Sequence, residues 1–295
     1  MDIDPTQLAK EVSRIRILTR RLMDERLSGD YHSVFKGQGI EFDETRPYQP
    51  GDDVRAIDWN VTARVGVPYI KRFCEERELT VLFAVDVSGS QSFGSGKNSK
   101  AARAAELTAL LAMAALNNLD RVGLILFSDH VIKSISPSKG RTAVQRLVRE
   151  VLAAEETREG TCLAEVLRFI SATQHRKAIV FLVSDFQDSA FADTLAVFSR
   201  RHDVIACRIS DPAEQVLPDI GLVELQDPET GETLLVDTSD RTLRETFASE
   251  TSALRIEQER LFRRLGIDLL DLSTQAPYIH AVRELFRQRV HRRRH

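Results

Sequence analysis

Continuous apolar runs alternate with amphipathic stretches along most of the chain. Runs typical of strands buried on both faces occupy residues 79–88, 121–128, 177–185 and 203–210. Stretches with helical spacing of apolar residues follow or precede them, at residues 100–119, 141–152, 163–172 and 190–200. Strands that alternate with helices of this length predict βαβ units and a mainly parallel sheet. We therefore expect an α/β fold, a Rossmann-like sandwich.

The chain before this alternation has two different patterns. Leu8, Val12, Ile15 and Leu22 recur at three-to-four spacing, which predicts one amphipathic helix that ends near residues 29–30. Residues 31–78 are rich in Gly, Pro, Asp and Arg and contain only short β-like runs. We interpret them as an extended arm of turns and short strands.

The pattern after the first strands is less regular. Residues 130–136 form a short, polar run that suits an edge strand. Two β-like runs within residues 222–237 flank an Asp-Pro-Glu-Thr-Gly segment, which predicts a hairpin. A helix over residues 240–264, a late strand over 266–273 and a helix over 281–289 complete the expected fold.

Composition narrows the class of protein. The 295 residues carry 41 Lys and Arg against 44 Asp and Glu, a balance that argues against a nucleic-acid-binding protein. Three widely spaced cysteines give no disulfide framework, so we expect a reducing compartment. The longest uncharged apolar stretch, residues 107–119, is too short for a transmembrane segment. We expect a cytoplasmic protein.

Oxygen-bearing side chains cluster at the carboxyl ends of the predicted strands. Asp86, Ser88 and Ser90 follow the first strand, Thr161 precedes a helix, and Asp185 ends a later strand. In parallel sheets these ends meet at one edge, where ligands bind. We therefore expect the five side chains to converge.

The donor set indicates a hard cation. Carboxylates and hydroxyls without imidazole or thiolate favour Mg²⁺ or Mn²⁺, with Ca²⁺ as a further option. Because hydroxyl ligands are neutral, the bound ion would stay electropositive and attract an acidic residue of another molecule. Alternatively, these residues only cap helices and form turns, which Asp, Ser and Thr do often.

These residues also carry a resemblance to a known family. Asp86-x-Ser88-x-Ser90, Thr161 and Asp185 are similar to the metal-ion-dependent adhesion site of von Willebrand factor A-like domains. More specifically, the chain resembles the bacterial domain-of-unknown-function family 58 at residues 37–59, 62–64, 86–90, 184–186, 211–232 and 266–274.

The pattern and the resemblance together predict three parts of the chain. These are an N-terminal helix and extended arm over 1–78, a von Willebrand factor A-like domain over 79–275 that includes the 222–237 hairpin, and a C-terminal helix with a basic tail over 276–295. The resemblance also implies a partner. Such proteins are thought to work with MoxR-type AAA+ ATPases as adaptors or chaperone-like partners. If the family's motif is carried over to this sequence, the metal ligands would be Asp86, Ser88, Ser90, Thr161 and Asp185.

A second cluster lies in the arm. It surrounds the chain's one tryptophan with opposite charges, in residues Arg46, Asp52, Asp53, Arg55, Asp58, Trp59 and Arg64. Arg and Trp are common anchors of protein interfaces, which suggests a partner-docking surface. The alternative, which we favour from sequence, is an internal salt-bridge network with Trp59 packed in the core and Asp52 and Asp53 at a helix N-cap.

Together these observations predict a non-enzymatic, metal-dependent protein-interaction module. No histidine stands in a recognisable catalytic spacing, so neither a triad nor a general base is indicated. Two alternatives stay open. One is a metal-assisted hydrolase in which Asp185 or Asp188 positions a water. The other is a metal-free structural scaffold.

Overall fold

The fold is built on a sheet whose strands are mostly parallel. The computed structural model describes residues 5–23, 25–35, 39–76, 78–96, 98–154, 157, 160–188, 190–227 and 231–293. Two compact units are present, one formed by Met1–Val34 with Thr80–His295 and the other by Phe35–Leu79.

The larger unit contains a six-stranded sheet in its described part. The strands run in the order β10 (Asp268–Ser273), β7 (Asp203–Ser210), β6 (Ile179–Ser184), β3 (Thr80–Asp86), β4 (Arg121–Phe127) and β5 (Val131–Ser138). Neighbouring strands pair in parallel except β5, which is antiparallel to β4. The predicted parallel sheet, the polar edge strand and the late strand are all confirmed.

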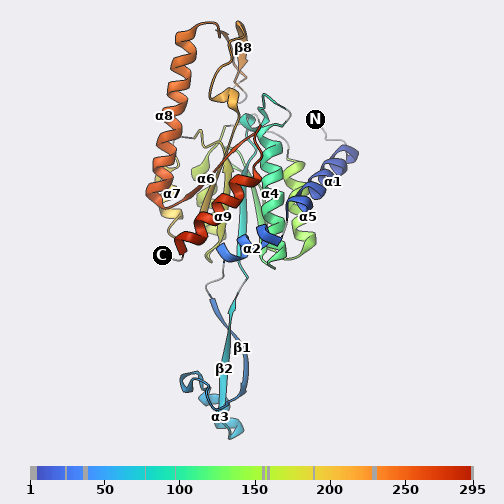
Figure 1. Cartoon of the computed structure of the whole chain (residues 1–295), viewed down its shortest axis with the longest axis vertical. Coiled ribbons are helices and arrows are strands. Elements are labelled where there is room, and N and C mark those ends of the chain that lie inside the picture. Colours follow the sequence, from blue (N-terminus) through green and yellow to red (C-terminus); the bar gives the residue numbers. More distant parts are fainter. Residues whose placement is uncertain are drawn as a thin grey trace. The chain divides into compact units, whose positions relative to one another are not determined.

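Helices cover both faces of this sheet (Figure 1). Apolar side chains of α6 (Leu163–Thr173), α7 (Ala192–Phe198) and α8 (Arg241–Leu265) form one buried cluster with the strands. The opposite face is covered by α4 (Lys100–Asn117), with α5 (Arg141–Leu152) and α9 (Ile279–Arg293) beside it. Ser99 caps α4 by accepting a hydrogen bond from the backbone of Ala102, at 3.1 Å.

The hairpin expected between these elements is confirmed. Strands β8 (Leu222–Gln226) and β9 (Thr233–Asp237) pair in antiparallel register, from Leu222 opposite Asp237 to Gln226 opposite Thr233. Most of their side chains are exposed, so the hairpin contributes little to the core.

The N-terminal region contradicts the prediction of one helix ending near residue 29. It forms two helices, α1 (Pro5–Leu22) and α2 (Glu25–Val34), and Gly29 lies inside the second. Leu27, Tyr31 and Val34 are buried, and the Tyr31 ring meets Phe286 of α9 edge-on at 5.9 Å. Burial of this apolar stripe outweighs the cost of about 1 kcal/mol for a glycine within a helix.

The smaller unit contains a twisted pair of strands and two short helical segments. β1 (Gly39–Pro47) and β2 (Tyr69–Glu76) are antiparallel, and η1 (Val54–Ala56) and α3 (Trp59–Val65) lie between them in sequence. Asp53 caps η1, and Asp58 caps α3 by accepting from the backbone of Asn60 at 3.0 Å. The expected arm is thus present, but it begins at Phe35 rather than at residue 31, and it contains a helix, α3, that the sequence pattern did not predict.

No helix among the described residues combines the length and the apolar composition needed to cross a membrane.

Candidate functional site

The candidate site lies where the strand order of the sheet reverses. From β3 the chain continues to β4 on one side, and later returns to place β6 on the other side. Such a switch point leaves a crevice beyond the carboxyl ends of the two strands. Asp86 is the last residue of β3, and Asp185 directly follows β6. Both carboxylates therefore reach the same rim of the sheet.

Asp86 is buried and surrounded by hydrogen-bond donors. Its Oδ1 accepts from the Ser88 backbone at 3.0 Å, and its Oδ2 accepts from the hydroxyls of Ser184 at 2.7 Å and Thr161 at 3.3 Å. Burial, and secondarily the charge of Asp185, raise the pKa of Asp86 to about 6, although the donors oppose the shift. An additional positive charge near this carboxylate would stabilise its ionised form.

The hydroxyls of Ser88 and Ser90 connect Asp86 to Asp185. Their Oγ atoms lie 3.2 Å apart, and Ser90 Oγ donates to Asp185 Oδ2 at 2.9 Å. Ser88 is fully buried, whereas Ser90 and Thr161 are partly accessible. The structure thus brings together the five residues that the sequence singled out.

One reading of Thr161 from sequence is wrong. The N-cap residue of α6 is Cys162, and Thr161 instead directs its hydroxyl to Asp86. The backbone at the start of α6 is held by Asp188, whose Oδ2 accepts from Leu163 N at 2.9 Å. Thr161 is therefore available to the rim, because a different residue caps the helix.

Lys100 is a rim residue that sequence reasoning missed. Its fully buried ammonium group lies 2.8 Å from Asp185 Oδ2 and 2.5 Å from Glu214 Oε1. Burial by itself would lower the pKa of Lys100, but the two carboxylates outweigh it and hold that pKa above its ordinary value. A lysine in the first turn opposes the helix dipole, and this was the available sequence signal.

The loop after β6 has a strained backbone. Phe186, next to Asp185, has a φ of 60°, in the left-handed region that a bulky residue rarely adopts. Its side chain is fully buried, its N–H donates to Ser184 Oγ at 3.1 Å and its carbonyl accepts from Gln258 at 2.8 Å. These contacts hold the loop in the conformation that presents Asp185 to the rim.

The rim residues fit a hard divalent cation by chemistry. Two carboxylates and three hydroxyls provide oxygen donors alone, as Mg²⁺ and Mn²⁺ prefer. Within the described part of the chain, no group of three or more His, Cys, Asp or Glu has a metal-binding arrangement. A cation at this rim would therefore depend on the serine and threonine hydroxyls for much of its coordination.

Only some of the charged residues singled out in the arm contact one another. Arg46 and Asp52 form a bidentate ion pair, with N–O distances of 2.9 and 2.7 Å, while Asp53 and Asp58 cap helical turns. The side chain of Trp59 is 70% exposed, so the expectation that it packs in a core is wrong. It occupies the first position of α3, none of whose residues is buried. The guanidinium-bearing residues Arg55 and Arg64 are also exposed.

Comparisons with known proteins give relatives of unknown role. An uncharacterized protein of Mycobacterium tuberculosis (strain H37Rv) is 30% identical over 281 residues, which cover 94% of this chain and 88% of the relative. An uncharacterized Mycobacterium avium protein is 33% identical over 143 residues, which cover 48% of this chain and 84% of the relative.

Two solved structures are similar over 72% of this chain. They are the conserved hypothetical protein BatB from Bacteroides thetaiotaomicron, with 99% of that chain covered, 13% identity and a TM-score of 0.46, and the SpRpn10 VWA domain, with 95% covered, 9% identity and a TM-score of 0.37.

A family model decides the assignment. The model described as "Protein of unknown function DUF58" matches residues 44–257, which include both strands of the switch point and all five rim residues. The resemblance to this family noted from the sequence motifs is thereby confirmed, and the six-stranded, mainly parallel sheet confirms the expected α/β fold. This chain belongs to the DUF58 family.

Proposed function

We propose that this protein is a non-enzymatic interaction module whose rim binds a divalent cation and, through it, an acidic residue of a partner protein. The observation that carries this proposal is the convergence of Asp86, Ser88, Ser90, Thr161 and Asp185, from three separate loops, at the switch point of the sheet. If these five residues only capped helices and formed turns, they would not all need to lie at the same edge of the sheet.

Each rim residue has a role in this proposal. Asp86 and Asp185 would hold Mg²⁺ or Mn²⁺, or alternatively Ca²⁺, and the three hydroxyls would complete the protein's share of the coordination. The bound ion would supply an electropositive point for a carboxylate of the partner. Ser184 keeps Asp86 in place by its 2.7 Å hydrogen bond, and the strained Phe186 backbone positions Asp185.

The partner we propose is a MoxR-type AAA+ ATPase, which this protein would serve as an adaptor in assembly or chaperone-like work. Membership of the DUF58 family supports this choice, because the resemblance implies such partners. The arm offers a second contact, since its residues Val54, Trp59, Val65 and Val67 are exposed by 49–70%. Exposed aromatic and aliphatic side chains beside arginines are typical of interface anchors.

The geometry gives little support to the hydrolase alternative. Asp188 accepts hydrogen bonds from Leu163 N at 2.9 Å and from Ala190 N at 2.8 Å, so both its oxygens hold the backbone. Asp185 is ion-paired with Lys100. Neither carboxylate has the freedom expected of a general base.

The metal-free scaffold has one specific observation in its favour. The Lys100 ammonium already places a positive charge 2.8 Å from Asp185, and it is itself fully buried. This ammonium group could neutralise negative charge of the rim carboxylates without a metal ion. The metal-dependent module requires a divalent cation at the rim in addition to the Lys100 ammonium, whereas the scaffold requires only Lys100.

Calorimetric titration of Mg²⁺ and Mn²⁺ into the full chain distinguishes the metal-dependent module from the metal-free scaffold. We expect saturable binding that is lost in Asp86→Ala and kept in the control Asp193→Ala, which removes an exposed carboxylate of α7. Circular dichroism would verify that both variants are folded. No binding to the folded wild-type chain, or equal binding by Asp86→Ala, would overturn the proposal in favour of the scaffold.

A further inference from the structure

A pocket on the side of the larger unit, away from the rim, combines apolar walls with unpaired arginines. It has a volume of about 290 Å³ and lies between α1, α4 and α5. Apolar side chains from all three helices form most of its lining: Val12, Ile15, Ile17, Ala109, Met113, Val144 and Val148. Its size is at the lower end of that of small-molecule sites.

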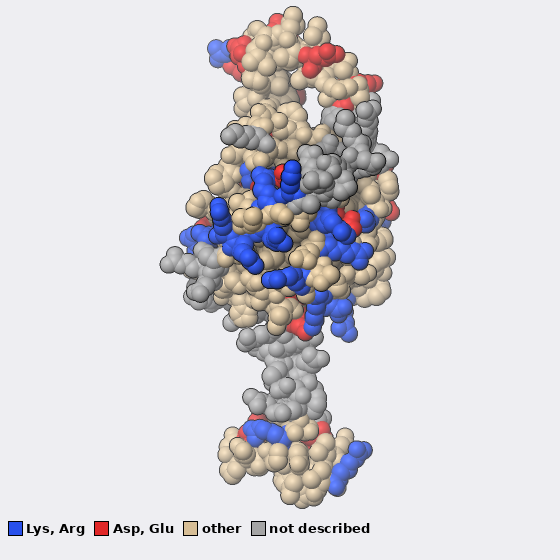
Figure 2. Space-filling view, turned by 90° about the vertical axis from the view of Figure 1, so that its right-hand side faces the viewer, with Lys and Arg blue, Asp and Glu red and all other residues tan. Residues whose placement is uncertain are grey.

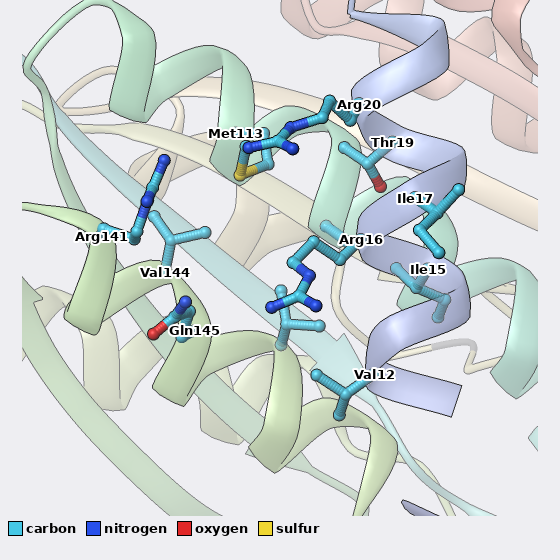
Figure 3. Close-up of a pocket in the computed structure, with 12 residues that line it drawn as sticks. Val12, Ile15, Arg16, Ile17, Thr19, Arg20, Met113, Arg141, Val144 and Gln145 are labelled. Carbon is cyan, nitrogen blue, oxygen red and sulfur yellow. The ribbon is translucent and has the colours of Figure 1, made fainter. Parts of the chain in front are cut away.

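Three arginines surround this pocket. Arg16 and Arg20 extend from α1 toward the opposite wall, where Arg141, Val144 and Gln145 lie (Figure 3). No carboxylate is present among the twelve lining residues. Within the described part of the chain, none of the three guanidinium groups has an acidic partner, in contrast to Arg103, Arg208 and Arg289 of the same unit.

All three arginines are exposed to solvent, and an anion bound between them would lower their mutual repulsion. Arg16 and Arg20 are four residues apart on one helix, where like charges repel each other. Arg141 is the first residue of α5, at the positive end of that helix dipole. The N-cap residue is Gly140, so no side chain caps the helix there. Figure 2, which faces the side that carries α1 and α5, shows Lys and Arg gathered over this surface with few acidic residues.

Thr19 adds a second unsatisfied group. It lines the pocket, its side chain is 1% exposed, and its hydroxyl has no hydrogen-bond partner among the described residues. A buried hydroxyl without a partner costs free energy.

We propose that this pocket binds a small amphiphilic anion, with a carboxylate or phosphate head held by Arg16, Arg20 and Arg141 and a short alkyl tail against the apolar walls. A membrane surface fits less well, because insertion requires protruding apolar side chains. Of the apolar lining residues, only Ile17 is largely exposed, at 53%. The site is independent of the rim and of any metal there.

The test is calorimetric titration of decanoate, below its micelle concentration, into the full chain without divalent cations. We expect saturable one-to-one binding, with decanol and acetate each binding at least about tenfold more weakly, because each lacks half of the recognised chemistry. The double variant Arg16→Gln/Arg141→Gln should weaken decanoate by about tenfold or more. Arg146→Gln, an exposed α5 arginine that does not line the pocket, should bind as the wild type does.

Three outcomes would overturn this inference. One is an absence of saturable decanoate binding to the folded chain. Another is equal loss in the Arg146→Gln control, which would indicate a diffuse basic surface. The third is binding to phosphatidylglycerol vesicles, sensitive to Arg16→Gln/Arg141→Gln, without binding of decanoate, which would indicate a membrane surface instead.

Discussion

The rim and the arm both contain charged residues, but in different surroundings. At the rim, Asp86, Lys100 and Asp185 are almost fully buried, and each charged group contacts a partner of fixed geometry. In the arm, Trp59, Arg55 and Arg64 are exposed, and the partly exposed Arg46 forms a bidentate pair with Asp52. Burial therefore distinguishes the preorganised rim from the exposed surface around Trp59.

The largest effect is expected from removal of the buried ammonium. Lys100→Met leaves Asp185 and Glu214 without their counter-charge, and breaking a buried pair in this way costs about 3–5 kcal/mol. Urea unfolding in the absence of divalent cations would measure the loss. Lys133→Met is the matched control, because Lys133 pairs with Glu150 on the surface and its loss should cost less than about 1 kcal/mol.

The same variant sharpens the question of metal binding. If the rim holds a divalent cation, Lys100→Met should bind Mg²⁺ more tightly than the wild type, since a competing positive charge next to Asp185 has been removed. Added Mg²⁺ should then recover part of the lost stability. A Lys100→Met protein that is destabilised and indifferent to Mg²⁺ would contradict the metal-dependent function and leave the scaffold.

A smaller effect, with a distinct pH dependence, is expected at Asp211. This fully buried carboxylate accepts from the backbone of Ser95 at 3.0 Å and of Ala213 at 2.9 Å, and from the Thr274 hydroxyl at 2.5 Å. Burial alone would raise the pKa of Asp211, but the donors from Ser95, Thr274 and Ala213 outweigh it and lower that pKa below its ordinary 3.8.

The sign of the pH effect follows from this shift. Because the folded-state pKa lies below the unfolded value, the Asp211 carboxylate contributes stability above pH 3.8, and the contribution is lost as pH falls through the folded pKa. Asp211→Asn should cost about 1–3 kcal/mol at neutral pH and less in acid. Chemical denaturation of both proteins at several pH values would test this, and a difference independent of pH would contradict it.

The sequence predicts the buried rim better than the exposed arm. The rim strands were recognisable because burial on both faces demands uninterrupted apolar residues, as in β3 and β6. The five oxygen donors were recognisable because their positions at strand ends fix where they meet. At Lys100 the sequence offers only an unfavourable lysine in the first turn of a helix, and it does not reveal the partner Glu214, which is 114 residues away.

The failures have tertiary causes as well. The sequence predicts a helix end at Gly29, yet packing of Tyr31 against Phe286 keeps α2 continuous there. The orientation of Trp59 depends on how the arm turns between β1 and β2, and a tryptophan alone does not reveal which way it points. The unpaired arginines of the α1–α5 pocket are on helices far apart in sequence, so only the structure brings them together.

The smallest effect on stability is expected at Trp59. Since 70% of its side chain is already in contact with water, Trp59→Ala should change the free energy of unfolding by no more than about 0.5 kcal/mol. Urea denaturation checks this directly, and a loss above about 2 kcal/mol would mean that the tryptophan is packed after all. If the arm is a partner surface, the same folded variant should bind the partner more weakly while its Mg²⁺ titration stays unchanged, because hot-spot contacts depend on exposed aromatic anchors. Asp86→Ala should show the reverse pattern, with Mg²⁺ binding lost and the arm intact, so the pair of variants assigns partner binding to the rim, to the arm or to both.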